Sequence, residues 1–198
     1  MKTIDVRFSA SDMAEIKSMV GKRMIGYKCD PFIFSTSVYG IVGIRLEDTS
    51  YAFTNSLEVM DYFGDPEDVA RFRISRIEYA DIKSLVQGQV MVETPVDSVI
   101  ADVIVVNECQ RLFEKGVQIY EVMVTRGIIF QFEDGHELSF EKNIWFSEDI
   151  TVGKGYDLIE RFTPVGEFAE GWSDNYRGEC SRELISALSL EKHFEKLE

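Results

Sequence analysis

The spacing of apolar residues along the chain changes soon after the N-terminus. In FSASDMAEIKSMVG, Met13, Ile16 and Val20 recur at helical spacing. Ser9 is placed to cap the first turn, and Gly21 follows the last one. Beyond this segment, β-branched and aromatic residues alternate or cluster between turn signals, which is the pattern of strands. The sequence therefore predicts a short N-terminal helix followed by mainly β structure.

The predicted strands fall into an early and a late group. The early group covers 23–28, 32–47, 50–60 and 70–79, and the late group covers 118–134, 136–146 and 155–165. Between them, residues 98–108 fit either a strand or a helix capped by Thr94, and their Val and Ile content favours a strand. Residues 109–116 predict a single helical turn ending at Gly116. Residues 167–198 predict a glycine-punctuated loop followed by a helical end.

Three landmarks recur in the same order in the two groups. The matching segments are GIRLED with IIFQFED, YFGDPEDV with WFSEDI, and RFRISRI with GYDLIERF. Repeated landmarks at one period indicate internal duplication. We therefore predict an α+β protein, mainly antiparallel β with a short N-terminal helix, in which a three-stranded unit is duplicated. Its halves would be residues 1–90 and 91–198, meeting in one compact domain or as two abutting ones.

The second landmark pairs two aromatic residues with acids. Tyr62 and Phe63 precede one acidic stretch, and Trp145 and Phe146 precede the other. A strand that ends in a core and turns in water needs such an anchor, so we interpret the four rings as core residues and not as a ligand site. On this interpretation the acids that follow them form loops.

Composition sets the broad class. The chain has 198 residues, of which 45% are hydrophobic, enough to build a core. No run approaches the roughly 18 apolar residues of a membrane span, and the N-terminus lacks the apolar stretch of a signal peptide. The three cysteines, Cys29, Cys109 and Cys180, are far apart and odd in number, which argues against a disulfide framework. We expect a soluble, cytoplasmic protein with reduced thiols.

Negative charge is concentrated in the second half of the chain. Against 21 Lys and Arg there are 35 Asp and Glu, a net charge of −14. Between Phe132 and Asp174, 11 acids face three bases, a net of −8. A surface of this sign repels phosphate, because nucleic-acid binding needs Lys and Arg to replace condensed counterions. Direct nucleic-acid binding is therefore not expected, whereas a basic cleft on another protein would be complementary.

Candidate catalytic groups are few. His136 is the only histidine near several acids, and a divalent metal would accept such ligands. EDGH also has the form of a hairpin turn, and we favour that interpretation of His136. His193 lies in a charged tail, and the acids next to Cys109 and Cys180 should raise the pKa of both thiols. No nucleophile, phosphate-loop or zinc-protease motif occurs.

Acids recur at predicted strand ends, where a β scaffold would hold them at fixed separations. Because duplex DNA carries roughly one negative charge per 1.7 Å of axis, a rigid row of carboxylates can imitate it and occupy a basic groove. The leading hypothesis is a non-enzymatic interaction module that inhibits a basic nucleic-acid-handling partner such as a nuclease. The kind of protein we have in mind is a phage-encoded inhibitor of host nucleases, including CRISPR effectors. This analogy rests on charge and size alone. The predicted partner-binding residues are Glu133, Asp134, Glu137, Glu148, Asp149, Glu167, Glu170 and Asp174.

Two alternatives stay open at this point. One is a small metal-dependent hydrolase that uses carboxylates near His136, and the other is a structural or accessory subunit. The leading hypothesis, the interaction module, requires no cofactor and no membrane. Duplication also allows a homodimer that exposes two acidic faces.

Overall fold

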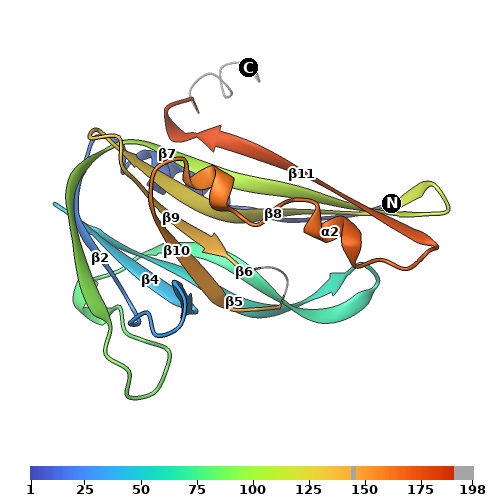
Figure 1. The fold of residues 1–198 in the computed structure, drawn as a ribbon, viewed down its shortest axis with the longest axis horizontal. Coiled ribbons are helices and arrows are strands. Elements are labelled where there is room, and N and C mark those ends of the chain that lie inside the picture. Colours follow the sequence, from blue (N-terminus) through green and yellow to red (C-terminus); the bar gives the residue numbers. More distant parts are fainter. Residues whose placement is uncertain (144–145, 190–198) are drawn as a thin grey trace.

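Backbone pairing between strands organises the chain into one 11-stranded sheet (Figure 1). The computed structural model describes residues 1–143 and 146–189. The strands are β1 (Lys2–Val6), β2 (Arg23–Cys29), β3 (Ser37–Tyr39), β4 (Ile41–Leu46), β5 (Ser50–Tyr62), β6 (Asp65–Arg76), β7 (Val92–Glu114), β8 (Val117–Phe132), β9 (Glu137–Lys142), β10 (Asp149–Gly155) and β11 (Tyr176–Ser186). The helices are α1 (Ala10–Lys17) and α2 (Glu167–Glu170), with 3-10 segments η1 (Tyr79–Asp81), η2 (Leu158–Arg161) and η3 (Ala187–Ser189). The mainly antiparallel β class is confirmed, and β1 with β8 forms the one parallel pair among the described strands.

The strand β7 joins two layers of the sheet. Its first residues, 92–99, pair with β2, and its remaining length pairs with β8 on one side and β11 on the other. In Figure 1 the layer of β7, β8 and β11 lies above the layer of β4, β5 and β6. Between the layers, the rings of Phe53, Phe130 and Phe140 contact one another, with centroids 5.4–5.9 Å apart. One core thus contains residues from both predicted halves, and the division at residue 90 stays a prediction.

The helix α1 covers one edge of this core. Ser9 accepts a hydrogen bond from the Asp12 amide, and the Asp12 carboxylate accepts one from the Ser9 amide, so the predicted N-cap is confirmed. The helix ends at Lys17, before the predicted boundary. The Gly21 amide instead donates to the carbonyl of Ile100, which fastens the chain to β7. Within the helix, Ile16 is fully buried and belongs to the core.

The predicted helical turn at 109–116 is wrong, because residues 109–114 form the last part of β7. Each of them up to Glu114 has a partner in β8 and in β11. Two neighbouring strands satisfy the backbone on both sides, which outweighs a local preference for a turn. The chain then reverses at Lys115 and Gly116, both with positive φ.

Two further predictions in the second half are wrong. Residues 155–165 were expected to form a strand, but the strand β10 ends at Gly155 and η2 follows. Leu158 and Phe162 are buried with Val106 and Ile129, so their apolar side chains pack on the sheet instead of extending it. The segment 176–186, expected to be a loop and helix, is the strand β11. The third landmark of the proposed repeat is therefore not a strand in both halves, and duplication stays a prediction.

Candidate functional site

The eight acids predicted to bind a partner do not form one surface. Glu133 and Asp134 lie in the turn after β8, at its Phe132 end. Glu167 and Glu170 lie on α2, and Asp174 precedes β11. The first residue of β11 pairs with Glu114, next to the opposite end of β8. At about 3.3 Å per residue, roughly 50 Å of strand separates Asp174 from the turn after β8, whereas Glu167, which lines a small cavity with Arg126, lies about half as far from that turn. The expected single negative surface is therefore not formed by all eight.

Three of the predicted acids have a local structural role. Both oxygens of Glu137 are used: one accepts from the Gln131 amide group at 2.9 Å and the other from the Leu158 backbone amide at 2.7 Å. Asp134 accepts from the backbone amide of His136 at 3.0 Å, as in an Asx turn. Glu148 accepts from the hydroxyl of Tyr39, which raises the pKa of that tyrosine. Such bonds shape turns and strand ends without any partner protein.

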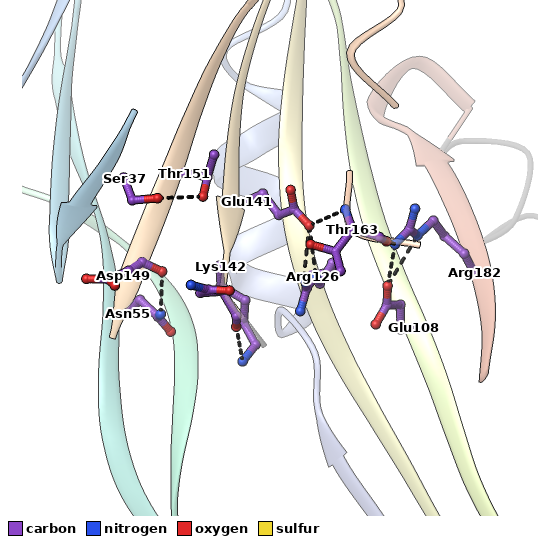
Figure 2. A network of polar contacts seen from close by, with 11 residues as sticks. Ser37, Asn55, Glu108, Arg126, Glu141, Lys142, Asp149, Thr151, Thr163 and Arg182 are labelled. Atoms are coloured by element: carbon purple, nitrogen blue, oxygen red, sulfur yellow. Dashed lines mark hydrogen bonds and ion pairs between the residues drawn. The ribbon is translucent and has the colours of Figure 1, made fainter. Parts of the chain in front are cut away.

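Asp149 lies beside Glu148 at the start of β10. Its backbone carbonyl accepts from the side chain of Asn55 on β5 at 3.1 Å, a contact that ties the two layers together (Figure 2). The next residue of β10, Ile150, pairs with Lys142. Lys142 lies at the opposite end of β9 from Glu137. Glu148 and Asp149 thus lie at the opposite end of β9 from Glu137.

A cleft of about 410 Å³ opens at the α2 end of the molecule, between α2 and the hairpin of β5 and β6. Its aromatic lining consists of Tyr62, Phe63, Phe146, Phe168 and Trp172. Its acidic lining consists of Asp65, Glu67 and Glu167. We call this site the aromatic-acidic cleft. It brings together segments of the chain that lie far apart in sequence, and only Glu167 belongs to the predicted partner-binding set.

The turn between β5 and β6 fixes one wall of the cleft. Phe63 and Gly64 both have positive φ, 55° and 111°, as the two central residues of a tight hairpin turn. For a phenylalanine this backbone region costs on the order of 1 kcal/mol. The ring of Phe63 contacts those of Tyr120, Phe168 and Trp172, with centroids 5.2–5.7 Å apart. These contacts offset the strain and hold the ring in place.

Trp172 continues this wall, in contact with the ring of Phe63. Its indole nitrogen donates to the carbonyl of Phe168 at 2.8 Å, which fixes the orientation of the ring. Gly178 on β11 leaves room for it, since a Cβ there would lie 2.5 Å from the indole nitrogen. Phe146, by contrast, is 49% exposed, so its interpretation as a core residue is wrong, whereas Tyr62 is buried as predicted. Trp145 lies outside the described residues.

Among the described residues, the acids of the cleft have no counter-ion. Asp65 and Glu67 were expected in a loop, but they lie in β6, two residues apart and hence on one face. Glu167 is the first residue of α2. All three are exposed, and none forms an ion pair within residues 1–143 and 146–189. Carboxylates beside ring faces create a negative potential that attracts cations.

A buried ionic network lies next to the cleft, and all its carboxylates are paired (Figure 2). The Arg126 guanidinium donates twice to one oxygen of Glu141, at 3.0 and 3.1 Å, with both side chains less than 10% exposed. The amide of Thr163 donates to the same oxygen. Across β7 and β11, Arg182 donates to Glu108 at 2.6 Å. This network fastens the segment after η2 to the sheet.

Lys142 adds an unmatched amine to this interior. Its side chain is 4% exposed and donates to the carbonyl of Ala70 at 2.8 Å. Burial, with a smaller contribution from the charge of Arg126, lowers the pKa of Lys142 to about 7. The amine is therefore close to half-neutral at physiological pH. Its enclosure argues for a packing role, because a nucleophilic lysine must meet a substrate.

The remaining candidate groups have ordinary environments. Burial raises the pKa of Cys29 to about 11 and that of Cys180 to about 12, and it also raises the pKa of Cys109. The predicted direction is confirmed for Cys109 and Cys180, but the main cause is burial, and the acids that contribute are Glu121 near Cys109 and Glu108 near Cys180 instead of the sequence neighbours. His136 is exposed in the turn between β8 and β9, as predicted, and its ring nitrogen lies 2.9 Å from the hydroxyl of Tyr156. His193 lies outside the described residues.

No cluster of three or more potential metal ligands occurs within the part of the chain that the structure describes. Among the helices described, none has the length and apolar character needed to cross a membrane. The chain matches no family model, no curated protein and no solved structure. The aromatic-acidic cleft therefore has to be interpreted from its own geometry.

Proposed function

We propose that the protein is a non-enzymatic interaction module that inhibits or regulates a basic, nucleic-acid-handling protein by docking the aromatic-acidic cleft against its nucleic-acid groove. The observation that supports this proposal is the convergence of Asp65, Glu67 and Glu167 around exposed aromatic surface, with no counter-ion for any of them in the part of the chain that the structure describes. Grooves that bind nucleic acid are lined by Lys and Arg, which complement such a site. The net charge of −14 would steer the encounter.

The proposal places the main contact at the α2 end. Glu170 and Asp174 lie near it and can extend the contact, whereas Glu133, Asp134, Glu137, Glu148 and Asp149 would be peripheral. A nuclease is the kind of partner we propose, and a cytoplasmic phage protein is the kind of source. Direct binding of nucleic acid is not part of the proposal. Internal duplication and a homodimer stay predictions that the proposal does not need.

Binding through charge makes a testable demand on salt. We expect a lysate freed of nucleic acid to yield a basic partner that is retained at about 50 mM salt and released at about 500 mM, because ions screen exposed charges. The purified partner should then lose DNA binding when this protein is added. The triple variant D65N/E67Q/E167Q should retain the partner at least about tenfold less well.

A matched control separates the cleft from total charge. The variant E47Q/E78Q/E133Q removes three exposed acids that lie away from the cleft, so its net charge equals that of the cleft variant. It should bind like the unmodified protein. Equal loss of binding in both variants, or partners that persist at every salt concentration, would overturn the proposal.

A further inference from the structure

We propose that the aromatic-acidic cleft receives one arginine side chain, presented by an exposed segment of the partner. This inference rests on the proposed function, since it names the chemical group through which a basic partner would be held. The side chain would enter between the two acids of β6 and Glu167 of α2, with its guanidinium against the aromatic lining.

The size of the cleft suits a single side chain. Its volume of about 410 Å³ lies near the lower limit of small-molecule sites, which span roughly 300–1,000 Å³. A helix or strand of the partner would not fit inside it, whereas one long side chain with a few waters would. The extended loops of a nucleic-acid groove present such side chains.

The lining selects arginine over other cations. A guanidinium is planar and weakly hydrated, so it stacks on rings and donates two parallel hydrogen bonds to one carboxylate. A lysine ammonium is compact and strongly hydrated, and it loses more on entering an aromatic site. The residue Phe146 is 49% exposed, and the centroid of its ring lies 6.0 Å from that of Tyr62. Its exposed face is apolar surface on which a guanidinium can stack.

The walls are fixed before any partner arrives. Trp172 is held by its hydrogen bond to Phe168 and by the space over Gly178. Phe63 is held by the turn at Gly64 and by three ring contacts. Few side chains then have to become ordered on binding, so the loss of conformational entropy that weakens binding is small. Anionic and phosphate groups are disfavoured because the three acids repel them.

A peptide series tests the choice of arginine directly. The probes are acetylated and amidated Gly-Ser peptides that carry one central arginine, lysine or citrulline, titrated calorimetrically at about 20 mM salt, where screening is weak. Citrulline keeps the shape of arginine and lacks its charge. We expect the arginine peptide to bind at least about tenfold more tightly than citrulline and about threefold more tightly than lysine. Equal binding of arginine and citrulline, or of arginine and lysine, would overturn the inference.

Two variants locate the binding site. F146A removes a half-exposed ring at little cost to the fold, and W172L removes a wall of the cleft. Each should weaken the arginine peptide at least about fivefold, with E133Q as the control that leaves it unchanged. Circular dichroism shows whether W172L is folded, and F146A decides the question if it is not. Unchanged affinity in F146A would place the arginine elsewhere.

The outcomes for the two proposals are separable. If the arginine peptide binds the cleft but no basic partner is captured, the inference about the cleft stands and the proposed function fails. If a basic partner is captured equally well by F146A and W172L, the proposed function stands on charge alone and the inference fails.

Discussion

Two groups of charges adjoin at α2, and they differ in whether the protein pairs them. In the buried network, Arg126 and Arg182 each contact a carboxylate. In the aromatic-acidic cleft, Glu167 and the acids of β6 have no such contact among the described residues. Glu167 and Phe168 border both regions, because they also line a small interior cavity beside Arg126. The start of α2 thus lies between carboxylates that are paired with arginine and carboxylates that have no ion pair among the described residues.

The difference shows which charges serve the fold. A buried pair is costly to break, since the partner left behind is an uncompensated charge in a medium of low polarity. Exposed acids that repel one another contribute nothing to stability, and their position beside rings is what the proposed binding role requires. Four predictions on the free energy of unfolding follow from this contrast, and they can break or sharpen it.

The largest effect is expected for Arg126→Met. Removal of this guanidinium leaves Glu141 buried without its cation, which should lower the free energy of unfolding by about 3–5 kcal/mol. Urea denaturation at neutral pH measures the loss. The control is Arg111→Met, which breaks the more exposed pair with Glu121 and should cost less than about 1 kcal/mol. Similar losses for both variants would remove the distinction between buried and exposed charge.

A smaller effect, of opposite sign, is expected for Lys142→Met. The unfolded chain keeps this amine protonated up to about pH 10.5, whereas the folded protein releases the proton near pH 7, its lowered pKa. The folded state is therefore penalised below pH 10.5, and its stability should rise with pH between 7 and 10.5. Methionine removes the penalty and should raise the free energy of unfolding at pH 7 by about 2 kcal/mol.

Urea denaturation of both proteins across this pH range measures the Lys142 effect. Subtracting the variant from the unmodified protein isolates the amine from other groups that titrate. A difference that does not change with pH would mean that the pKa of Lys142 is ordinary and that the interior tolerates its charge.

The third prediction concerns the walls of the cleft and leaves its charges intact. In Gly178→Ala, the added methyl would meet the indole of Trp172, so the ring must shift and lose its hydrogen bond to Phe168. We expect a loss of about 1 kcal/mol in stability. The indole N–H resonance of Trp172 should move in the NMR spectrum. An unmoved resonance would show that the indole keeps its position and that β11 moves instead, which would contradict the prediction.

The smallest effect on stability is expected for D65N/E67Q/E167Q. These exposed acids have no ion-pair partner within residues 1–143 and 146–189, so the free energy of unfolding should change by less than about 0.5 kcal/mol, upward at low salt because repulsion is relieved. Thermal unfolding at low and high salt checks the sign. A marked destabilisation would mean that the cleft acids hold the fold together after all.

Sequence alone predicted the elements whose pattern is local. The capping of α1 needs only Ser9 and Asp12, and the strands β2, β4 and β5 need only alternating residues between turns. The strand β11 and the end of β7 depend instead on each other, since they pair along Tyr176–Ser186. Distant pairing of this kind leaves no local signature. The failures therefore fall where a neighbouring strand, and not the segment itself, decides the structure.

The cleft was missed for a related reason. The aromatic pair at Tyr62 indicated an anchored strand end, and the acids that follow it were noted, but they were assigned to a loop. Phe168 and Trp172 meet Phe63 only because β11 brings their segment beside the long hairpin of β7 and β8. Net charge correctly marked the second half as acidic, yet two of the three cleft acids come from the first half. Charge along a sequence does not report which acids share a surface.

The position of β7 also bears on how the protein is made. Its opening residues need β2, which is synthesised early, whereas its later residues need β11, which is synthesised last among the described strands. Until Ser186 has been synthesised, we expect the edge of β7 that pairs with β11 to have no partner strand. Such an edge invites pairing with other chains, so a chaperone that shields it during translation would raise the yield of folded protein.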